Sequence, residues 1–92
     1  MESESKQVTG TKKETIDIQS GTGRGVDLGT NTPSLEIKIM NEGPSNNVIV
    51  SGSHYELRTG QQGTFRLGDL TSGSVITLQN NGFEHARVQI SW

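Results

Sequence analysis

The chain has 92 residues, a length that predicts one small domain. Its formal net charge of −2 at pH 7 means that it lacks the excess of basic residues that attracts nucleic acid or an anionic membrane. It contains no cysteine, which excludes disulfides and thiolate metal sites. Only 28% of its residues are hydrophobic and 12 are glycine, a composition that favours short strands joined by tight turns over packed helices.

The first 14 residues are polar, with charges of both signs and no periodic spacing of apolar side chains. Such a segment has too little apolar surface to join a core, so the sequence predicts an extended N-terminal arm over residues 1–14. No apolar run follows its basic residues, which predicts that the chain carries no signal peptide. No stretch approaches the length that crosses a bilayer.

Seven segments after the arm alternate apolar and polar residues with the period of two that turns one face of a strand toward a core. These segments are 14–20, 34–40, 46–51, 54–58, 64–68, 74–79 and 84–92. Their inward positions hold Ile16, Ile18, Leu35, Ile37, Ile39, Val48, Val50, Tyr55, Leu57, Phe65, Leu67, Ile76, Leu78, Ala86, Val88, Ile90 and Trp92. No window shows a helical period, so we expect no helix beyond a turn near residues 67–72.

Clusters of Gly, Asn and Ser separate these segments, and the strand starts recur at about 8 to 12 residues, as in antiparallel sandwiches and barrels. The sequence therefore predicts a single all-β domain over residues 15–92. We expect a small antiparallel β-sandwich or barrel of about six or seven strands.

The glycine-rich stretch SGTGRGVDLG, residues 20–29, invites comparison with phosphate-binding loops. A dinucleotide loop requires G-x-G-x-x-G, whereas the third glycine here comes one residue early, and a Walker loop requires a Lys followed by Ser or Thr, which is absent. We therefore expect no cofactor, and we interpret residues 20–34 as a flexible connector. Such a connector would let the first strand pair away from its sequence neighbour, including on another subunit.

His54 and Glu56 lie two residues apart on a predicted strand and share a face, so they could start a metal site with Glu84, His85 or Asp69. A solvated strand face is the more frequent explanation of such a pair. The chain has neither a cysteine nor a G-x-S-x-G motif to anchor nucleophilic catalysis. We expect no catalytic or metal-binding residues and no enzyme; a small metal-dependent enzyme using His54, Glu56 and His85 is an open alternative.

Phe83 differs from the other aromatic residues because it follows the turn signal NNG and precedes the last strand. Its ring either lies exposed at a loop tip, where it would contact a partner, or folds over the end of the sandwich. An exposed ring suits a ligand-binding module, such as a lectin-like or host-surface-binding domain of a fibre or toxin. That module would use the loops around Asn46, Asn47, Asn80, Asn81 and Phe83.

The polar arm MESESKQVTGTKKE and the core GTFRLGDLTSGSVITLQNNGFEHARVQISW resemble the small all-β virion proteins of tailed bacteriophages, especially head-decoration or cement proteins. The resemblance implies a non-enzymatic structural protein, made in the host cytoplasm and located in the virion. Its β domain would sit over junctions of coat subunits and stabilise the capsid, with residues 1–20 as the capsid-binding arm.

The same resemblance implies a homo-oligomer, with a trimer favoured, and the major coat protein or another large assembly as partner. The small core also favours stabilisation by partner subunits. Neither nucleic acid nor a membrane is expected as a partner. The candidate partner-binding residues are Lys6, Val8, Lys12, Lys13, Ile16, Ile18 and Phe83.

Overall fold

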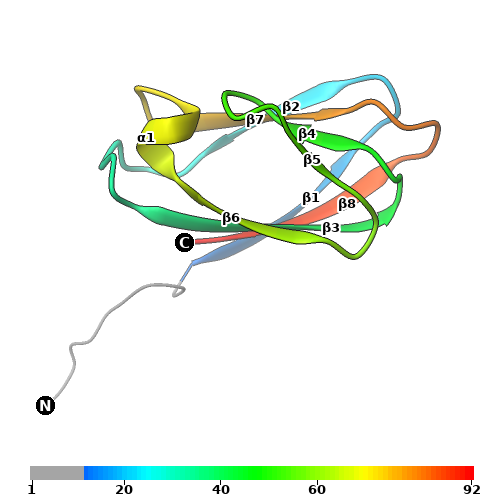
Figure 1. The fold of residues 1–92 in the computed structure, drawn as a ribbon, viewed down its shortest axis with the longest axis horizontal. Helices are drawn as coiled ribbons and strands as arrows, with labels where there is room; N and C mark the ends of the chain where they lie inside the picture. Colours follow the sequence, from blue (N-terminus) through cyan, green and yellow to red (C-terminus); the bar gives the residue numbers. More distant parts are fainter. Residues whose placement is uncertain (1–11) are drawn as a thin grey trace, which may run out of the picture.

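The computed structural model describes residues 12–92, which form an all-β domain with one helical turn (Figure 1). The strands are β1 (Lys13–Ile18), β2 (Gly23–Asp27), β3 (Glu36–Pro44), β4 (Val48–Val50), β5 (Tyr55–Leu57), β6 (Gln62–Arg66), β7 (Val75–Asn80) and β8 (Ala86–Ser91). The turn expected after β6 is a four-residue helix, α1 (Leu67–Leu70). Residues 12–92 contain no helix long and apolar enough to cross a membrane.

The strands form two antiparallel four-stranded sheets, in the orders β1-β8-β3-β6 and β2-β7-β4-β5, which lie over one another in Figure 1. Pairing is symmetrical about the middle of the chain, because β1 pairs with β8, β2 with β7, β3 with β6 and β4 with β5. A long hairpin rolled up on itself gives this pairing, which is the jelly-roll topology of eight strands. The antiparallel sandwich predicted from the sequence is confirmed, and β1 pairs within its own chain.

Fifteen apolar side chains, each at most 5% exposed, form one core between the sheets. Thirteen of them occupy inward positions that the alternation of the sequence predicts. The other two are Val26 and Leu28, which come from the stretch expected to be a connector. The period of two therefore located most of the core, because each strand has one face toward the opposite sheet and one toward water.

The prediction that residues 20–34 are a flexible connector is wrong, because the middle of this stretch forms β2 and pairs with β7. Glycines occupy the outward positions of β2 before Val26, so the alternation is limited to Val26, Asp27 and Leu28 and is too short to indicate a strand. A Cβ on Gly25 would lie 3.2 Å from Cγ1 of Val75 in the neighbouring strand. Glycine at position 25 therefore leaves room for the side chain of Val75.

The predicted arm also ends earlier than residue 14, because β1 begins at Lys13. Lys12 and Trp92 exchange two backbone hydrogen bonds of 3.0 Å, so the sheet pairing extends to the last residue of the chain. One face of β1 is outward, which is why charged residues are tolerated in it. The remainder of the predicted arm, residues 1–11, lies outside the described residues.

Two of the three aromatic residues assigned to the core, Phe65 and Trp92, pack against it, whereas Tyr55 is 48% exposed. Tyr55 has the inward phase of its strand, but β5 is an edge strand, so the ring reaches the open side of the sandwich. There it meets Phe65 of β6 edge to face, with the ring centroids 5.5 Å apart. Trp92 donates from Nε1 to the carbonyl of Leu28 at 3.1 Å.

The loops at the two ends of the sandwich come from different parts of the chain. The four loops 19–22, 45–47, 58–61 and 81–85 gather at one end, which we call the loop end. Lys12 and Trp92 lie at the opposite end, together with α1 (Figure 1). The chain therefore enters the domain far from the loop end.

Candidate functional site

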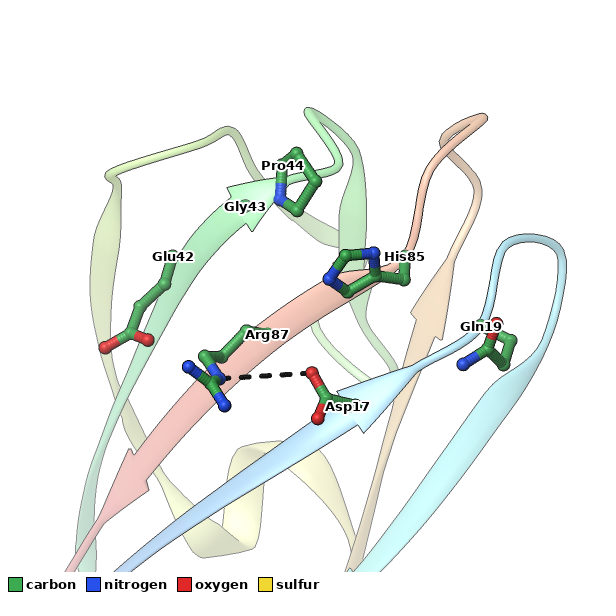
Figure 2. A pocket seen from close by; sticks show the side chains of 7 residues that line it. All are labelled: Asp17, Gln19, Glu42, Gly43, Pro44, His85 and Arg87. Carbon is green, nitrogen blue, oxygen red and sulfur yellow. Dashed lines mark ion pairs between the residues drawn. The ribbon is translucent and has the colours of Figure 1, made fainter.

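Two hollows open near the loop end, and the wider one lies on the outer face of the β1-β8-β3 strands (Figure 2). It is a shallow depression of about 800 Å³ in which Nε of Arg87 faces Oδ1 of Asp17 at 4.0 Å. The two side chains are 59% and 53% exposed, so water screens the pair and it contributes little to stability. Nothing in this depression distinguishes one class of ligand from another.

The second hollow is a groove of about 390 Å³ between the β3–β4 loop, the β7–β8 loop and the end of β5. Its volume falls in the range of small-ligand sites, roughly 300 to 1,000 Å³. We call it the Phe83 groove, after its aromatic side chain. Its polar walls include Asn46, Asn47, Glu56, Arg58, Asn81 and Glu84.

Phe83 stands at the rim of this groove with its ring 101% exposed, the full exposure of a side chain that no neighbour covers. Of the two arrangements that the sequence allowed, the exposed one is therefore observed, and the ring does not fold over the sandwich. The exposed ring stabilises nothing in the isolated domain, and its position on a loop beside a hollow makes it a candidate contact residue.

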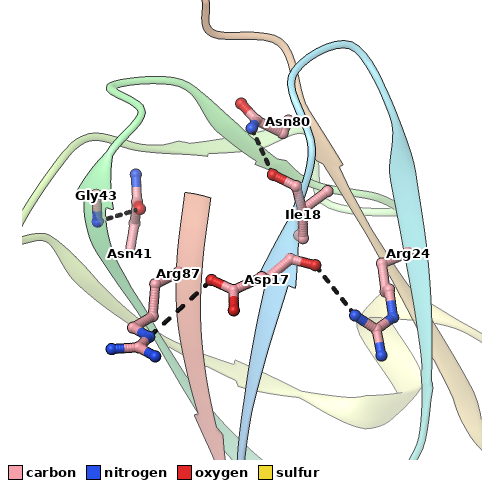
Figure 3. Close-up of polar contacts among 7 residues, drawn as sticks. All are labelled: Asp17, Ile18, Arg24, Asn41, Gly43, Asn80 and Arg87. Carbon is pink, nitrogen blue, oxygen red and sulfur yellow. Dashed lines mark hydrogen bonds and ion pairs between the residues drawn. The ribbon is translucent and has the colours of Figure 1, made fainter. Parts of the chain in front are cut away.

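Asn80 fixes the loop that carries Phe83. This residue is 0% exposed, and its Nδ2 donates to the carbonyl of Ile18 at 2.9 Å (Figure 3). The same Nδ2 also donates to the carbonyl of Glu84 at 2.8 Å. Its Oδ1 accepts the backbone N–H of Gly82 at 2.9 Å. One buried amide thus joins the end of β1 to both sides of the loop tip. The Asn80 side chain therefore supports the loop from inside the protein, and its amide is not exposed to a ligand.

Ser45 and Asn47 hold the same loop from the other wall of the groove. The Ser45 hydroxyl donates to Oδ1 of Asn80 at 2.7 Å, and the N–H of Asn81 donates to the carbonyl of Asn47 at 2.9 Å. Gly82 passes so close that a Cβ on it would overlap the Ser45 hydroxyl. The β3–β4 and β7–β8 loops are therefore one connected unit rather than two independent loops.

Asn41 braces the β3–β4 loop from beneath. Its side chain is 0% exposed, and Nδ2 donates to the carbonyls of Ser45 at 2.8 Å and Leu57 at 3.0 Å. Its Oδ1 accepts the N–H of Gly43 at 2.8 Å, which Figure 3 also shows. Buried amides that satisfy their hydrogen bonds in this way specify one arrangement of the surrounding backbone.

The groove presents two carboxylates and one guanidinium, from Glu56, Glu84 and Arg58, which gives it a formal charge of −1. Asn46 is oriented because its Oδ1 accepts the N–H of Thr59 at 3.0 Å. Oδ1 of Asn47 is buried and has no hydrogen-bond partner among residues 12–92. A buried acceptor without a donor lowers the stability of the fold.

The partner-binding residues predicted near the N-terminus are not brought to the groove. Lys12 and Lys13 are exposed but lie at the opposite end of the sandwich, beside Trp92 and Ser91. Ile16 and Ile18 are 5% and 1% exposed, so these two predictions are corrected: both side chains face the core and offer a partner no surface. Lys6 and Val8 lie outside the described residues.

The metal alternative is not supported by the arrangement of its residues. His54 lies in the β4–β5 turn, whereas His85 lies at the loop end, so the jelly roll places the two imidazoles at opposite ends of the sandwich. Within residues 12–92, no three His, Asp or Glu side chains are close enough together to hold a metal ion. Glu56, the third proposed ligand, lines the Phe83 groove instead.

Of the groove residues, the sequence identified Phe83 and the asparagines but not Arg58, and it named Glu56 and Glu84 only in the alternative of a metal site. No local pattern marks these three, because they meet only when the β5 end and the β7–β8 loop come together. The order of strands in the two sheets is the information that was missing.

Comparison with solved structures supports the fold. The solution structure of a de novo designed double-stranded β-helix is similar, with a TM-score of 0.63 and 22% sequence identity over 88% of this chain and 97% of the designed one. At this identity the likeness concerns the fold alone. No family model matches the chain, and no curated protein matches it. Jelly rolls occur in capsid proteins, lectins and enzymes, so this fold does not by itself determine a function.

Proposed function

We propose that the chain is a non-enzymatic binding module that contacts a ligand or a surface through the Phe83 groove. The observation that carries the proposal is the fully exposed ring of Phe83 on a loop that buried side chains hold in place. In this position the ring does not contribute to the stability of the isolated fold. Contact with a partner would remove it from water, and aromatic side chains are among the residues that contribute most at interfaces.

The fixed loop supports the proposal for a second reason. Asn80 contacts both Gly82 and Glu84, on either side of Phe83, so the ring sits on a backbone that is ordered before any partner arrives. Binding then does not have to order the loop, which is one of the main free-energy costs of association. The loop end is therefore suited to recognition without rearrangement.

Photo-crosslinking tests this proposal in the cells or particles in which the protein works. A benzophenone-bearing phenylalanine at position 83 keeps an aromatic group on the loop. The control carries the same group at position 64, where Thr64 is exposed on the outer face of β6. We expect a discrete adduct from position 83 and none from position 64. Equal adducts from both positions, or none from position 83, would contradict the proposal.

A second candidate function is attachment to a larger assembly, with the phage head as the assembly that the sequence resemblance implies. The observation that favours it is the position of Lys12, which pairs with Trp92 at the end of the sandwich opposite the groove. If a partner bound residues 1–11, the Phe83 groove would point away from that partner. Attachment at one end and recognition at the other are then compatible in one small chain.

Deleting residues 1–11 tests the second candidate. All fifteen core side chains lie within residues 16–90, so we expect the shortened chain to melt cooperatively, like the full chain, but to be lost from purified particles. Normal incorporation into the particles would exclude an attachment role for this segment. Sedimentation of both versions measures the oligomer, which the resemblance predicts to be a trimer.

A further inference from the structure

The side chains of the Phe83 groove favour some classes of ligand over others. The ligand class inferred from them rests on the proposed binding function. We propose that it binds a neutral saccharide, with one sugar ring stacked on Phe83 and its hydroxyl groups held by the amides and carboxylates of the groove. Three features of the groove lead to this class: the ring, the planar polar groups around it, and the sign of the charge.

The ring supplies a flat apolar platform. Phe83 is exposed on all sides rather than recessed, so a flat ligand can lie across its face. A pyranose ring has one face made mainly of C–H groups, and these hydrogens meet the electron-rich face of an aromatic ring favourably. An aliphatic side chain would give apolar contact without this match in shape and charge distribution.

The polar walls supply paired donors and acceptors. Adjacent hydroxyls of a sugar each donate and accept, and an asparagine amide offers one group of each kind, while a carboxylate offers two acceptors. Asn46, Asn81, Glu56 and Glu84 are all exposed in the groove, and Asn46 is held in one orientation by Thr59. Such walls fit a ligand covered with hydroxyls better than an apolar peptide, which would leave these groups without partners.

The net negative charge of the groove disfavours anionic ligands. Glu56 and Glu84 outnumber Arg58, so phosphate, sulfated or sialylated ligands would meet a net negative wall. Like charges brought together in a partly enclosed site disfavour binding and reject such ligands. Among saccharides, neutral ones are therefore favoured, and amine-bearing ones are compatible with the two carboxylates.

The full chain, biotinylated and displayed on tetravalent streptavidin, is the probe for a microarray of defined glycans that carries neutral structures beside their sialylated and sulfated forms. Tetravalent display makes weak single-site affinities measurable. We expect binding to a set of neutral glycans and weaker or no binding to the matched acidic forms. Titration calorimetry with the best neutral glycan then gives the dissociation constant of each variant.

Three variants locate the site. Phe83→Ala should weaken binding by about tenfold or more, equivalent to about 1.4 kcal/mol, whereas Phe83→Trp should restore it because it keeps a flat ring. The matched control is Val75→Ala, which removes an exposed apolar side chain on β7, away from the groove lining, and should leave the affinity unchanged. Binding that survives Phe83→Ala would overturn the proposed site.

The remaining outcomes separate this inference from the proposed function. Preference for acidic glycans would overturn the charge argument. An array without signal, together with a protein adduct from position 83 in the photo-crosslinking experiment, would overturn the saccharide class and leave the binding module standing. No array signal and no adduct would overturn both.

Discussion

Ser45 and Asn80, 35 residues apart in the sequence, are joined by a hydrogen bond of 2.7 Å between the serine hydroxyl and Oδ1 of the asparagine. The bond connects the β3–β4 loop to the base of the β7–β8 loop, and so connects the two walls of the Phe83 groove. The shape of the candidate site therefore depends on residues that a ligand would not touch.

Asn80→Ala should lower the free energy of unfolding by at least about 3 kcal/mol, because it leaves the carbonyls of Ile18 and Glu84 and the N–H of Gly82 without their partner. Chemical denaturation measures the change. Asn81→Ala is the matched control, since the side chain of Asn81 is exposed, and it should stay within about 0.5 kcal/mol of the wild type. Equal effects of the two substitutions would show that the buried amide does not hold the loop.

Gly82→Ala should destabilise the fold by about 1 to 3 kcal/mol, because the added Cβ overlaps the Ser45 hydroxyl. In a Ser45→Ala background that oxygen is gone, so the same substitution should cost less. A double-mutant cycle by thermal or chemical denaturation measures this coupling. Additive effects would mean that the two loops are not in the contact described.

Phe83→Ala should leave the free energy of unfolding within about 0.5 kcal/mol of the wild type, because the ring contributes no burial to the fold. Phe65→Ala is the comparison, since that ring packs against the core and against Tyr55, and it should cost about 2 to 3 kcal/mol. Circular dichroism melts of both variants provide the measurement. A large loss of stability in Phe83→Ala would assign the ring a structural role and remove the main support for the proposed function.

The sequence predicted the fold class and thirteen of the fifteen core residues, because alternation with a period of two depends only on which residues are neighbours along one strand. It missed β2, since Gly23 and Gly25 have no side chains to mark the outward face. It placed Tyr55 in the core because alternation does not show that β5 is an edge strand.

The candidate site was less accessible to prediction. Phe83 and its neighbouring asparagines were identifiable from turn signals, but Arg58 reaches the groove only through the pairing of β4 with β5. The difference in burial between Asn80, which is buried, and Asn81, which is exposed, also depends on tertiary structure. Adjacent residues of the same type have opposite roles here, one holding the loop and one facing the groove.

The stability of the domain should depend on pH through Asp27, whose carboxylate accepts the N–H of Gly29 at 2.9 Å. This bond and a hydrogen bond with the Ser74 side chain lower the pKa of Asp27 below its ordinary value. A carboxyl whose pKa is lower in the folded chain stabilises the fold above its unfolded pKa, about 3.9, and loses that contribution as the pH falls through the folded pKa.

Asp27→Asn should therefore lose less stability than the wild type when the pH is lowered from roughly 5 to 2, because the variant has no proton to bind at this position. Urea denaturation over this pH range compares the two slopes. The same slope in both proteins would mean that Asp27 titrates alike in the folded and unfolded states.

The most direct measurement of the central claim is the accessibility of the Phe83 groove when the proposed partner is present. Because the chain contains no cysteine, Asn81→Cys introduces a single thiol beside Phe83 and Thr64→Cys a single thiol on the β6 face. Maleimide labelling compares each thiol in the isolated protein and in its native particles or cells. We expect the thiol at position 81 to become protected and the thiol at position 64 to remain reactive, whereas equal reactivity of position 81 in both states would contradict the claim that the loop end is the binding surface.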